Sequence, residues 1–205
     1  MRRWTRAVPA VAGAVALAVV LTGCGDSGAG KKSRGSGSSD SGAAGASGAE
    51  DKQTFRLGEA SPPKESDMKA SSGAMYTVTP TKVVTGTPAD MKNSGLKPDE
   101  KDGPQVPVYV WSTLTHKSGK IMEVGDMDDD LVVRTDRGQR TRALIVILGE
   151  ATWPDCPAPD RDKKLSAGQS ERICTAFLIP EGQKAAAVEL TQGFYKEPLE
   201  WPVAN

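Results

Sequence analysis

Short apolar runs separated by turn-forming residues constrain the fold of this 205-residue chain more than any other feature. The clearest run is VPVYVWSTLTH, residues 106–116, in which successive side chains of an extended strand point to opposite faces. One face carries aliphatic residues, namely Val106, Val108, Val110 and Leu114. The other carries aromatic residues and threonines, namely Tyr109, Trp111, Thr113 and Thr115. No segment after residue 54 shows a long 3.6-residue period, so the pattern predicts an all-β domain.

An edge strand and a hairpin are predicted among the other runs. Residues 75–84 are rich in β-branched side chains but contain Pro80, which cannot donate a hydrogen bond to a neighbouring strand, and this favours an edge position. Residues 131–135 and 141–148 flank DRGQR, which is typical of a hairpin turn. The run ALIVIL, residues 143–148, is apolar on both faces and is expected to be the most buried strand.

The C-terminal part of the chain supplies the last predicted strands. Residues 172–180 and 185–190 bracket a turn at EGQ, and residues 198–203 form a short closing strand. About seven strands with turns at this spacing predict an immunoglobulin-like two-sheet β-sandwich over residues 54–205.

Residues 1–23 have the composition of a signal peptide. Three arginines precede an apolar run at residues 10–21, which is too short to span a bilayer as a helix, since that takes roughly 20 residues. The following Leu21-Thr22-Gly23-Cys24 resembles the lipobox of bacterial lipoproteins, in which cleavage precedes a cysteine that carries a diacylglyceryl thioether. The resemblance implies that Cys24 is the lipid attachment site and that the protein is anchored at the extracytoplasmic face of the bacterial cell membrane. The alternatives are an uncleaved anchor and an ordinary cleavage site that leaves Cys24 a free thiol.

Residues 24–53 follow as the lipidated cysteine and a spacer composed mostly of Gly, Ser and Ala. The spacer has too little apolar surface to offset the entropy lost on ordering, so it is expected to be a disordered tether. Without residues 1–23 the chain has 23 basic and 26 acidic side chains, and this mild acidity disfavours nucleic acid as a partner. The expected partners are the membrane, through the lipid on Cys24, and a protein or another component of the cell envelope.

Cys156 and Cys174 are the two cysteines that remain for the folded domain. Outside the cytoplasm, two cysteines in one small domain are expected to form a disulfide. Closing a loop of about 18 residues contributes roughly 3 kcal/mol on the chain-entropy model. The alternative is a catalytic or metal-binding pair, but no histidine accompanies the two cysteines at ligand spacing.

A second resemblance covers residues 54–205. The order of VPVYVWSTLTHKSG, Cys156-Pro157, LSAGQSERICTAFLIPEGQ and LEWPV is similar to that of secreted, lipid-anchored actinobacterial proteins of uncharacterised function. Their single domain is immunoglobulin-like, of the telokin-like type, so the resemblance implies this fold and the disulfide and carries no established activity. The chain departs from that pattern at His116, where an Asn-Lys-Gly type of turn is expected.

His116 is the only histidine, so a hydrolase built on a histidine base would have to use it. It precedes Lys117-Ser118-Gly119, a predicted turn, and is expected to be an exposed turn residue. No serine stands in a nucleophile-elbow pattern such as G-x-S-x-G. We therefore expect no enzyme activity, no catalytic residues and no cofactor. A cell-envelope hydrolase assembled from scattered loops is the least favoured alternative.

The acidic run GDMDDD offers weak candidate metal ligands. Asp126, Asp128 and Asp130 have the one-three-five spacing of a calcium-binding loop. However, Leu131 and Arg137 stand where such a loop has glycine and glutamate, so a solvated acidic loop is favoured over a metal site. A calcium-dependent or structural envelope module that uses residues 126–130 is the alternative function.

Tyr109 and Trp111 share one strand face and are candidates for a recognition patch or a sugar platform. Large aromatic residues in a domain of this size are usually buried, so a second core face is the favoured interpretation, with the loop at residues 88–104 as a possible cover. The sequence as a whole predicts a lipid-anchored extracytoplasmic binding or interaction module whose partner it does not identify.

Overall fold

The computed structural model describes residues 52–97, 101–126, 130–145, 151–193 and 195–204. The predicted signal peptide, the lipobox with Cys24, and the spacer up to residue 51 lie outside the described residues, as does Asp128. None of the helices in the described ranges is both long enough and apolar enough to cross a membrane.

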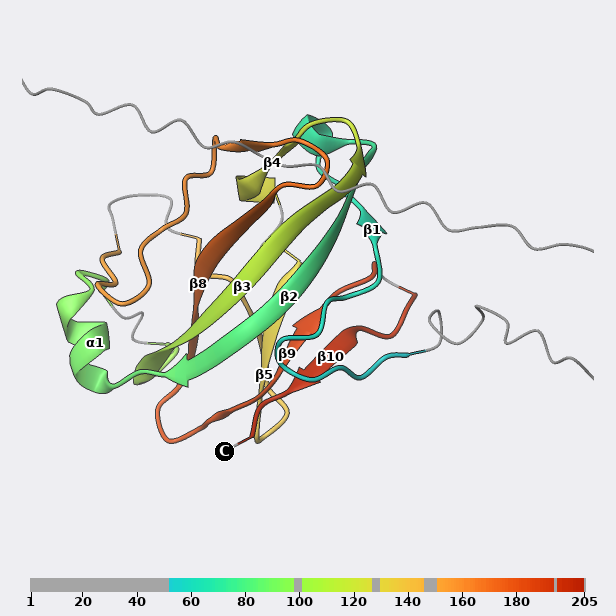
Figure 1. Cartoon of the computed structure of the whole chain (residues 1–205). Coiled ribbons are helices and arrows are strands. Elements are labelled where there is room, and N and C mark those ends of the chain that lie inside the picture. Colours follow the sequence, from blue (N-terminus) through green and yellow to red (C-terminus); the bar gives the residue numbers. More distant parts are fainter. Residues whose placement is uncertain (1–51, 98–100, 127–129, 146–150, 194, 205) are drawn as a thin grey trace, which may run out of the picture. The chain divides into compact units, whose positions relative to one another are not determined.

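Four antiparallel strands form the first sheet, in the order β1-β2-β3-β8 (Figure 1). Their bounds are Lys64–Glu65 (β1), Ala74–Thr85 (β2), Gln105–Gly119 (β3) and Ser170–Pro180 (β8). β1 pairs only with Met75 and Tyr76 of β2, and a register shift interrupts the pairing of β2 with β3 between Pro80 and Lys82. Beyond this irregularity no described strand pairs with the outer side of β2, so the predicted edge position is confirmed for its second half.

Four antiparallel strands also form the second sheet, in the order β10-β9-β5-β6. Their bounds are Leu131–Thr135 (β5), Arg140–Arg142 (β6), Ala185–Leu190 (β9) and Leu199–Pro202 (β10). β5 and β6 form the predicted hairpin, and its turn contains Gly138 with a φ of +80°, a conformation that glycine adopts without strain. The predicted turn after β8 carries the chain from the first sheet into β9 of the second.

Smaller elements flank the two sheets. A two-stranded sheet pairs β4 (Met122–Glu123) with β7 (Lys164–Leu165), and two 3-10 helices occupy Lys69–Ser71 (η2) and Val124–Asp126 (η3). The helix α1 (Pro88–Asn93) lies in the segment expected to be a loop. A capping box explains its start, because the Thr87 hydroxyl accepts from the Asp90 N–H at 3.2 Å and the Asp90 carboxylate accepts from the Thr87 N–H at 2.7 Å.

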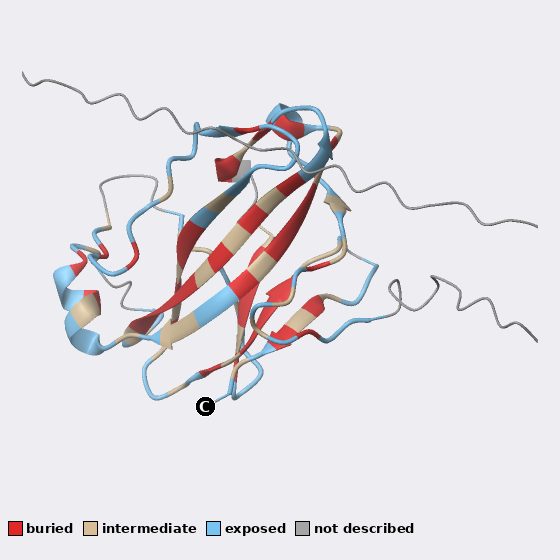
Figure 2. Cartoon of the chain, viewed as in Figure 1, coloured by how far each residue is buried: buried red, intermediate tan, exposed pale blue. Residues whose placement is uncertain are grey.

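The main core lies between the two sheets, which confirms the all-β two-sheet sandwich. The aliphatic face of β3 contributes its predicted residues, Val106, Val108, Val110 and Leu114. Figure 2 shows the resulting alternation of buried and less buried residues along β3. The second sheet contributes Trp201, which is fully buried and stacks on Phe55 with ring centroids 5.3 Å apart. The Trp201 indole N–H donates to the Glu59 carbonyl at 2.9 Å, so its one polar group is satisfied.

The prediction that residues 143–148 form the most buried strand is wrong for residues 143–145. β6 ends at Arg142, and Ala143 forms a single bridge to Phe177 of β8 while the Leu144 N–H donates to the Ala176 carbonyl at 2.9 Å. The chain thus passes from the edge of the second sheet to the edge of the first, where one side of the backbone faces outward. Ile145 is accordingly 72% exposed, and residues 146–148 lie outside the described residues.

The prediction of an exposed turn at His116 is also wrong. β3 continues to Gly119 because Ser118 and Gly119 still pair with Met75 and Ala74 of β2. His116 therefore lies inside the strand and is fully buried. Both of its ring nitrogens are at hydrogen-bond distance from backbone carbonyls. Nδ1 is 2.9 Å from the Leu165 oxygen of β7, and Nε2 is 2.8 Å from the Ser118 oxygen. The only histidine of the chain is a structural residue that joins β3 to β7.

Candidate recognition surface

The sheet register places chemically distinct side chains in rows across the outer face of the first sheet. Lys82 of β2 lies opposite Trp111 of β3, and Trp111 lies opposite Cys174 of β8. Residues that are directly opposite in neighbouring strands point to the same side of the sheet. The adjacent row contains Val84, Tyr109 and Ala176. The predicted alternation along β3 is therefore confirmed, with the aromatic residues on the side away from the main core.

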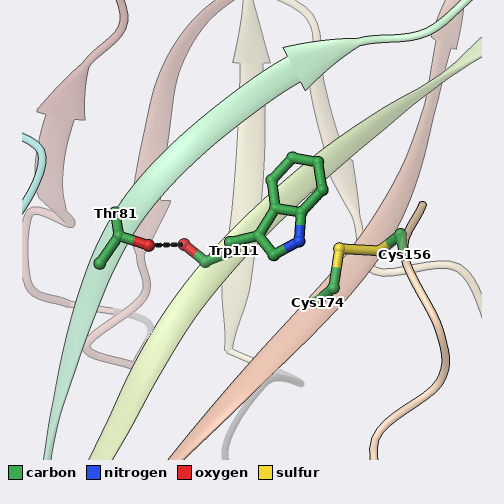
Figure 3. Close-up of a disulfide and its surroundings, with 4 residues drawn as sticks. All are labelled: Thr81, Trp111, Cys156 and Cys174. Atoms are coloured by element: carbon green, nitrogen blue, oxygen red, sulfur yellow. Dashed lines mark hydrogen bonds between the residues drawn. A yellow bond between two sulfur atoms is a disulfide. The ribbon is translucent and has the colours of Figure 1, made fainter.

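A disulfide fixes the segment that covers this face. Cys156 and Cys174 are bonded, with their Cα atoms 5.2 Å apart, as the sequence predicted (Figure 3). The Thr152 N–H donates to the Ser94 carbonyl at 3.0 Å, which ties the same segment to the residue after α1. The loop before β7 is thus held to the end of α1 and to β8. It brings apolar side chains onto the outer face of the first sheet.

The aromatic residues form a second, smaller core under that loop. Tyr109 packs edge-on against Trp153, with centroids 5.6 Å apart, and against Trp111, with centroids 6.1 Å apart. Met91 of α1 and both cysteines belong to the same buried cluster. The favoured interpretation of Tyr109 as a core residue is confirmed, and the cover consists of α1 together with the loop that contains Trp153.

Trp111 is only half-buried and marks the border of this second core. The Lys82 ammonium lies 4.5 Å from the centroid of its ring, within the range of a cation–π interaction. The Thr81 hydroxyl donates to the Trp111 carbonyl at 3.1 Å, at the irregularity in β2 (Figure 3). The backbone of Trp111 is thus fixed on both sides by β2 and β8, while part of its indole stays accessible.

A hollow of about 600 Å³ opens beside Trp111, and we call it the Trp111 hollow. It is lined by Lys82, Val84, Thr85, Gly86, Thr87, Asp90, Tyr109, Trp111 and Asp155. A Cβ atom at Gly86 would lie 2.8 Å from the Pro107 side chain and 3.0 Å from the Asp90 carboxylate. Only glycine lets the chain pass this close to β3, and this passage brings Asp90 to the hollow.

Two carboxylates and the Tyr109 hydroxyl set the electrostatics of the Trp111 hollow. Burial raises the pKa of Tyr109 to about 12, with further contributions from the negative charges of Asp90 and Asp155. Tyr109 as a whole is 5% exposed, but its hydroxyl bonds to no described protein group and is not one of the buried atoms that lack a partner, so it is open to solvent. The hollow therefore combines aromatic walls, a hydroxyl that can donate or accept, and acceptor-only carboxylates.

Among the weak metal-ligand candidates Asp126, Asp128 and Asp130, only Asp130 has a described side chain. The Asp130 carboxylate pairs with the Lys64 ammonium and accepts from the Thr191 hydroxyl at 3.2 Å. Asp126 ends η3, but its side chain is outside the described residues, as is all of Asp128. Across the described ranges, no group of three or more His, Cys, Asp or Glu side chains is placed to hold a metal ion.

Sequence reasoning found Tyr109 and Trp111 but missed three charged residues of the hollow. Lys82 follows from strand register, and Asp90 follows from the capping-box pattern that starts at Thr87. Asp155 has no local signal, because a disulfide at the next residue brings it to the hollow from a loop.

Comparisons with known proteins add one distant structural likeness. No protein-family model matches the chain, and no curated protein matches it. Among solved structures, the chain is similar to the secreted protein MPT63 from Mycobacterium tuberculosis, with 14% identity and a TM-score of 0.47. The match covers 74% of this chain and 98% of that one.

Proposed function

We propose that this chain is a lipid-anchored extracytoplasmic binding module that presents the outer face of its first sheet to a partner. The observation that carries the proposal is the disulfide between Cys156 and Cys174, because such bonds form and persist in oxidising compartments outside the cytoplasm. The lipobox-like Leu21–Cys24 sequence supports the anchor. One acyl chain gives only marginal membrane binding and two give stable binding, so a diacylated Cys24 needs no membrane-spanning segment.

The Trp111 hollow supports the binding role. Its aromatic walls are held in place before any ligand arrives, by strand pairing on both sides of Trp111 and by the disulfide-linked loop. Rigid aromatic side chains offer contact area at little cost in conformational entropy. A preorganised surface of this kind on an anchored domain acts by recognition close to the membrane.

The anchor is tested by intact mass and fractionation of the full-length chain, expressed in a bacterium that processes lipoproteins. Wild-type protein is expected in the membrane fraction, starting at Cys24, heavier by a diacylglyceryl group, and gaining two hydrogens on reduction. The Cys24→Ser variant is expected to leave the membrane fraction. The Cys156→Ser/Cys174→Ser variant is the matched control, since it keeps the lipid and loses only the gain on reduction. A Cys24→Ser variant that stays in the membrane to the wild-type extent contradicts the proposal.

The binding face is tested by site-specific photo-crosslinking in intact cells. A photo-reactive residue replaces Thr85, an exposed residue that lines the Trp111 hollow. The control position is Gln139, an exposed residue of the β5–β6 turn in the second sheet. We expect a discrete adduct from position 85 that Trp111→Ala abolishes, and no such adduct from position 139. The same adducts from both positions, with and without Trp111, would count against a specific face.

A further inference from the structure

The charges at the Trp111 hollow are unbalanced. Asp90 and Asp155 both line it, and neither forms an ion pair with any described residue. Both carboxylates act on the Tyr109 phenol, because each raises its pKa. Lys82 is the one cationic side chain in the described lining, so these residues carry a net negative charge. A site with this charge attracts cations and repels anions.

The Tyr109 hydroxyl is a polar group that the protein leaves available to a ligand in the Trp111 hollow. Tyr109 is 95% buried, but its hydroxyl is not one of the buried polar atoms that lack a partner, and no described protein group bonds to it, so this oxygen is open to solvent. The residue lines the Trp111 hollow, so a molecule in the hollow can replace solvent as the partner of this hydroxyl. An N–H donor suits the phenol oxygen as well as the two carboxylates.

The aromatic wall already binds a cation in the structure. The Lys82 ammonium lies 4.5 Å from the Trp111 ring centroid, where the negative face of the indole attracts positive charge. Lys82 is exposed and sits near the irregular part of β2, and its long side chain can swing away from the ring. An incoming cation therefore competes with Lys82 for the same indole.

We propose that the Trp111 hollow binds a cationic side chain, the ammonium of a lysine or the guanidinium of an arginine, carried by a protein partner. The alkyl stem of such a side chain packs along Trp111 and Val84, and its charged end donates to Asp90, Asp155 and the Tyr109 hydroxyl. The inference rests on the proposed binding role and names the chemistry of the group that is bound.

The test is a titration of the full-length protein in detergent micelles, followed through the indole N–H resonances after 15N labelling of tryptophan. The probes are Nα-acetyl-lysine amide and Nα-acetyl-arginine amide, with Nα-acetyl-glutamate amide, glucose and tetramethylammonium as comparison compounds. Trp111→Phe assigns the Trp111 signal, and the buried Trp201 serves as internal control. We expect saturable shifts of the Trp111 signal with the lysine or arginine amide, and none with the glutamate amide or glucose.

Two variants with opposite expected effects sharpen the test. Asp155→Asn removes one carboxylate and should weaken binding roughly five-fold, the effect of one nearby charge in a solvated site. Lys82→Met removes the competing cation and should tighten binding by roughly two- to five-fold. Both residues are exposed, so neither change should unfold the domain, and thermal melting verifies this.

The opposite pattern, with Lys82→Met weakening and Asp155→Asn strengthening binding, would overturn the proposal in favour of an anionic ligand. A saturable shift of the Trp111 signal with glucose alone would overturn the proposal as well. The absence of a saturable shift with every probe would also overturn it. Tighter binding of tetramethylammonium than of both amides would exclude a peptide side chain in favour of a quaternary ammonium group. The titration needs neither the anchor nor the partner, so its failure is distinguishable from failure of the fractionation and crosslinking experiments.

Discussion

His116 shows how one side chain can join two elements that are distant in sequence. Its ring connects the end of β3 to the Leu165 carbonyl of β7, and it lies in a fully buried site. In His116→Ala, the ring contacts with the Leu165 and Ser118 carbonyls are lost and a buried cavity remains, so we expect a loss of about 2–4 kcal/mol in the free energy of unfolding. Urea denaturation measures this, with the exposed neighbour changed in Lys117→Ala as control. A variant within 0.5 kcal/mol of wild type would contradict this role, since exposed positions typically vary by about that much.

Tyr109 makes the stability of the domain depend on pH in the alkaline range. Its pKa in the folded protein is raised to about 12 by burial and by Asp90 and Asp155, whereas an unfolded tyrosine titrates near about 10. The folded state holds the proton more tightly, so the stability from this group is complete below about pH 10 and is lost as the pH rises through about 12. Tyr109→Phe cannot ionise and should show a smaller fall in Tm across this window.

The control for this measurement is Tyr195→Phe, because Tyr195 is fully exposed. It should follow the wild-type curve of Tm against pH. Asp155→Asn removes one of the negative charges that oppose ionisation and should lower the pKa of Tyr109 in a spectrophotometric titration. If Tyr109→Phe loses as much Tm as wild type between about pH 10 and 12, the phenol is not the group that titrates.

The disulfide holds the loop that covers the second core. It closes a separation of 18 residues between Cys156 and Cys174. The Cys156→Ser/Cys174→Ser variant should lose about 3 kcal/mol of unfolding free energy on the chain-entropy model. Its loop should also loosen over Tyr109, so the fluorescence of Trp153 should shift towards that of a solvated indole. Equal stability of the variant and the oxidised wild type would show that the loop is held by packing alone.

Local patterns predicted some elements and failed for others, for identifiable physical reasons. The alternation along β3 depends only on side-chain period, so the two faces of β3 could be assigned from the sequence. The run at residues 143–148 is apolar in every position, which leaves its sheet and its exposure undetermined until the hairpin and β8 are placed. The prediction for His116 was wrong for a similar reason. The length of β3 depends on its pairing with β2, and the burial of the His116 side chain depends on β7.

In the candidate site, too, local patterns predict some residues, and long-range contacts determine the positions of others. Tyr109 and Trp111 could be identified from one strand, and Lys82 becomes their neighbour once the register of β2 is known. Asp155 could not be placed from sequence, because its position depends on a disulfide and on the Thr152–Ser94 hydrogen bond. Charges on loops that are fixed by long-range contacts are the part of a site that sequence patterns leave open.

At the scale of the whole sandwich, the outer faces of the two sheets have different chemistry. The second sheet carries a network in which Glu189 of β9 is 3% exposed and binds Arg134 at 2.8 Å and Arg140 at 2.7 Å, while Arg134 also binds Glu200 at 2.7 Å. These charges satisfy one another across β5, β6, β9 and β10. The Trp111 hollow on the first sheet has two carboxylates that form no ion pair with the described residues, so the two faces differ in how their charges are paired.

This separation predicts independent effects of two carboxylate substitutions. Glu189→Gln keeps the volume but leaves two arginines without their shared charge, and we expect a loss of about 1–3 kcal/mol in unfolding free energy, below the value for a fully buried pair because both arginines are partly solvated. Its Trp111 resonance should still respond to Nα-acetyl-lysine amide as in wild type. Asp155→Asn should do the reverse, keeping the unfolding free energy and weakening the response. Because sites on opposite faces with no shared partners contribute additively, the double variant should show both effects at their single-variant size. A double variant whose binding falls further than that of Asp155→Asn would mean that the two faces are coupled through the core.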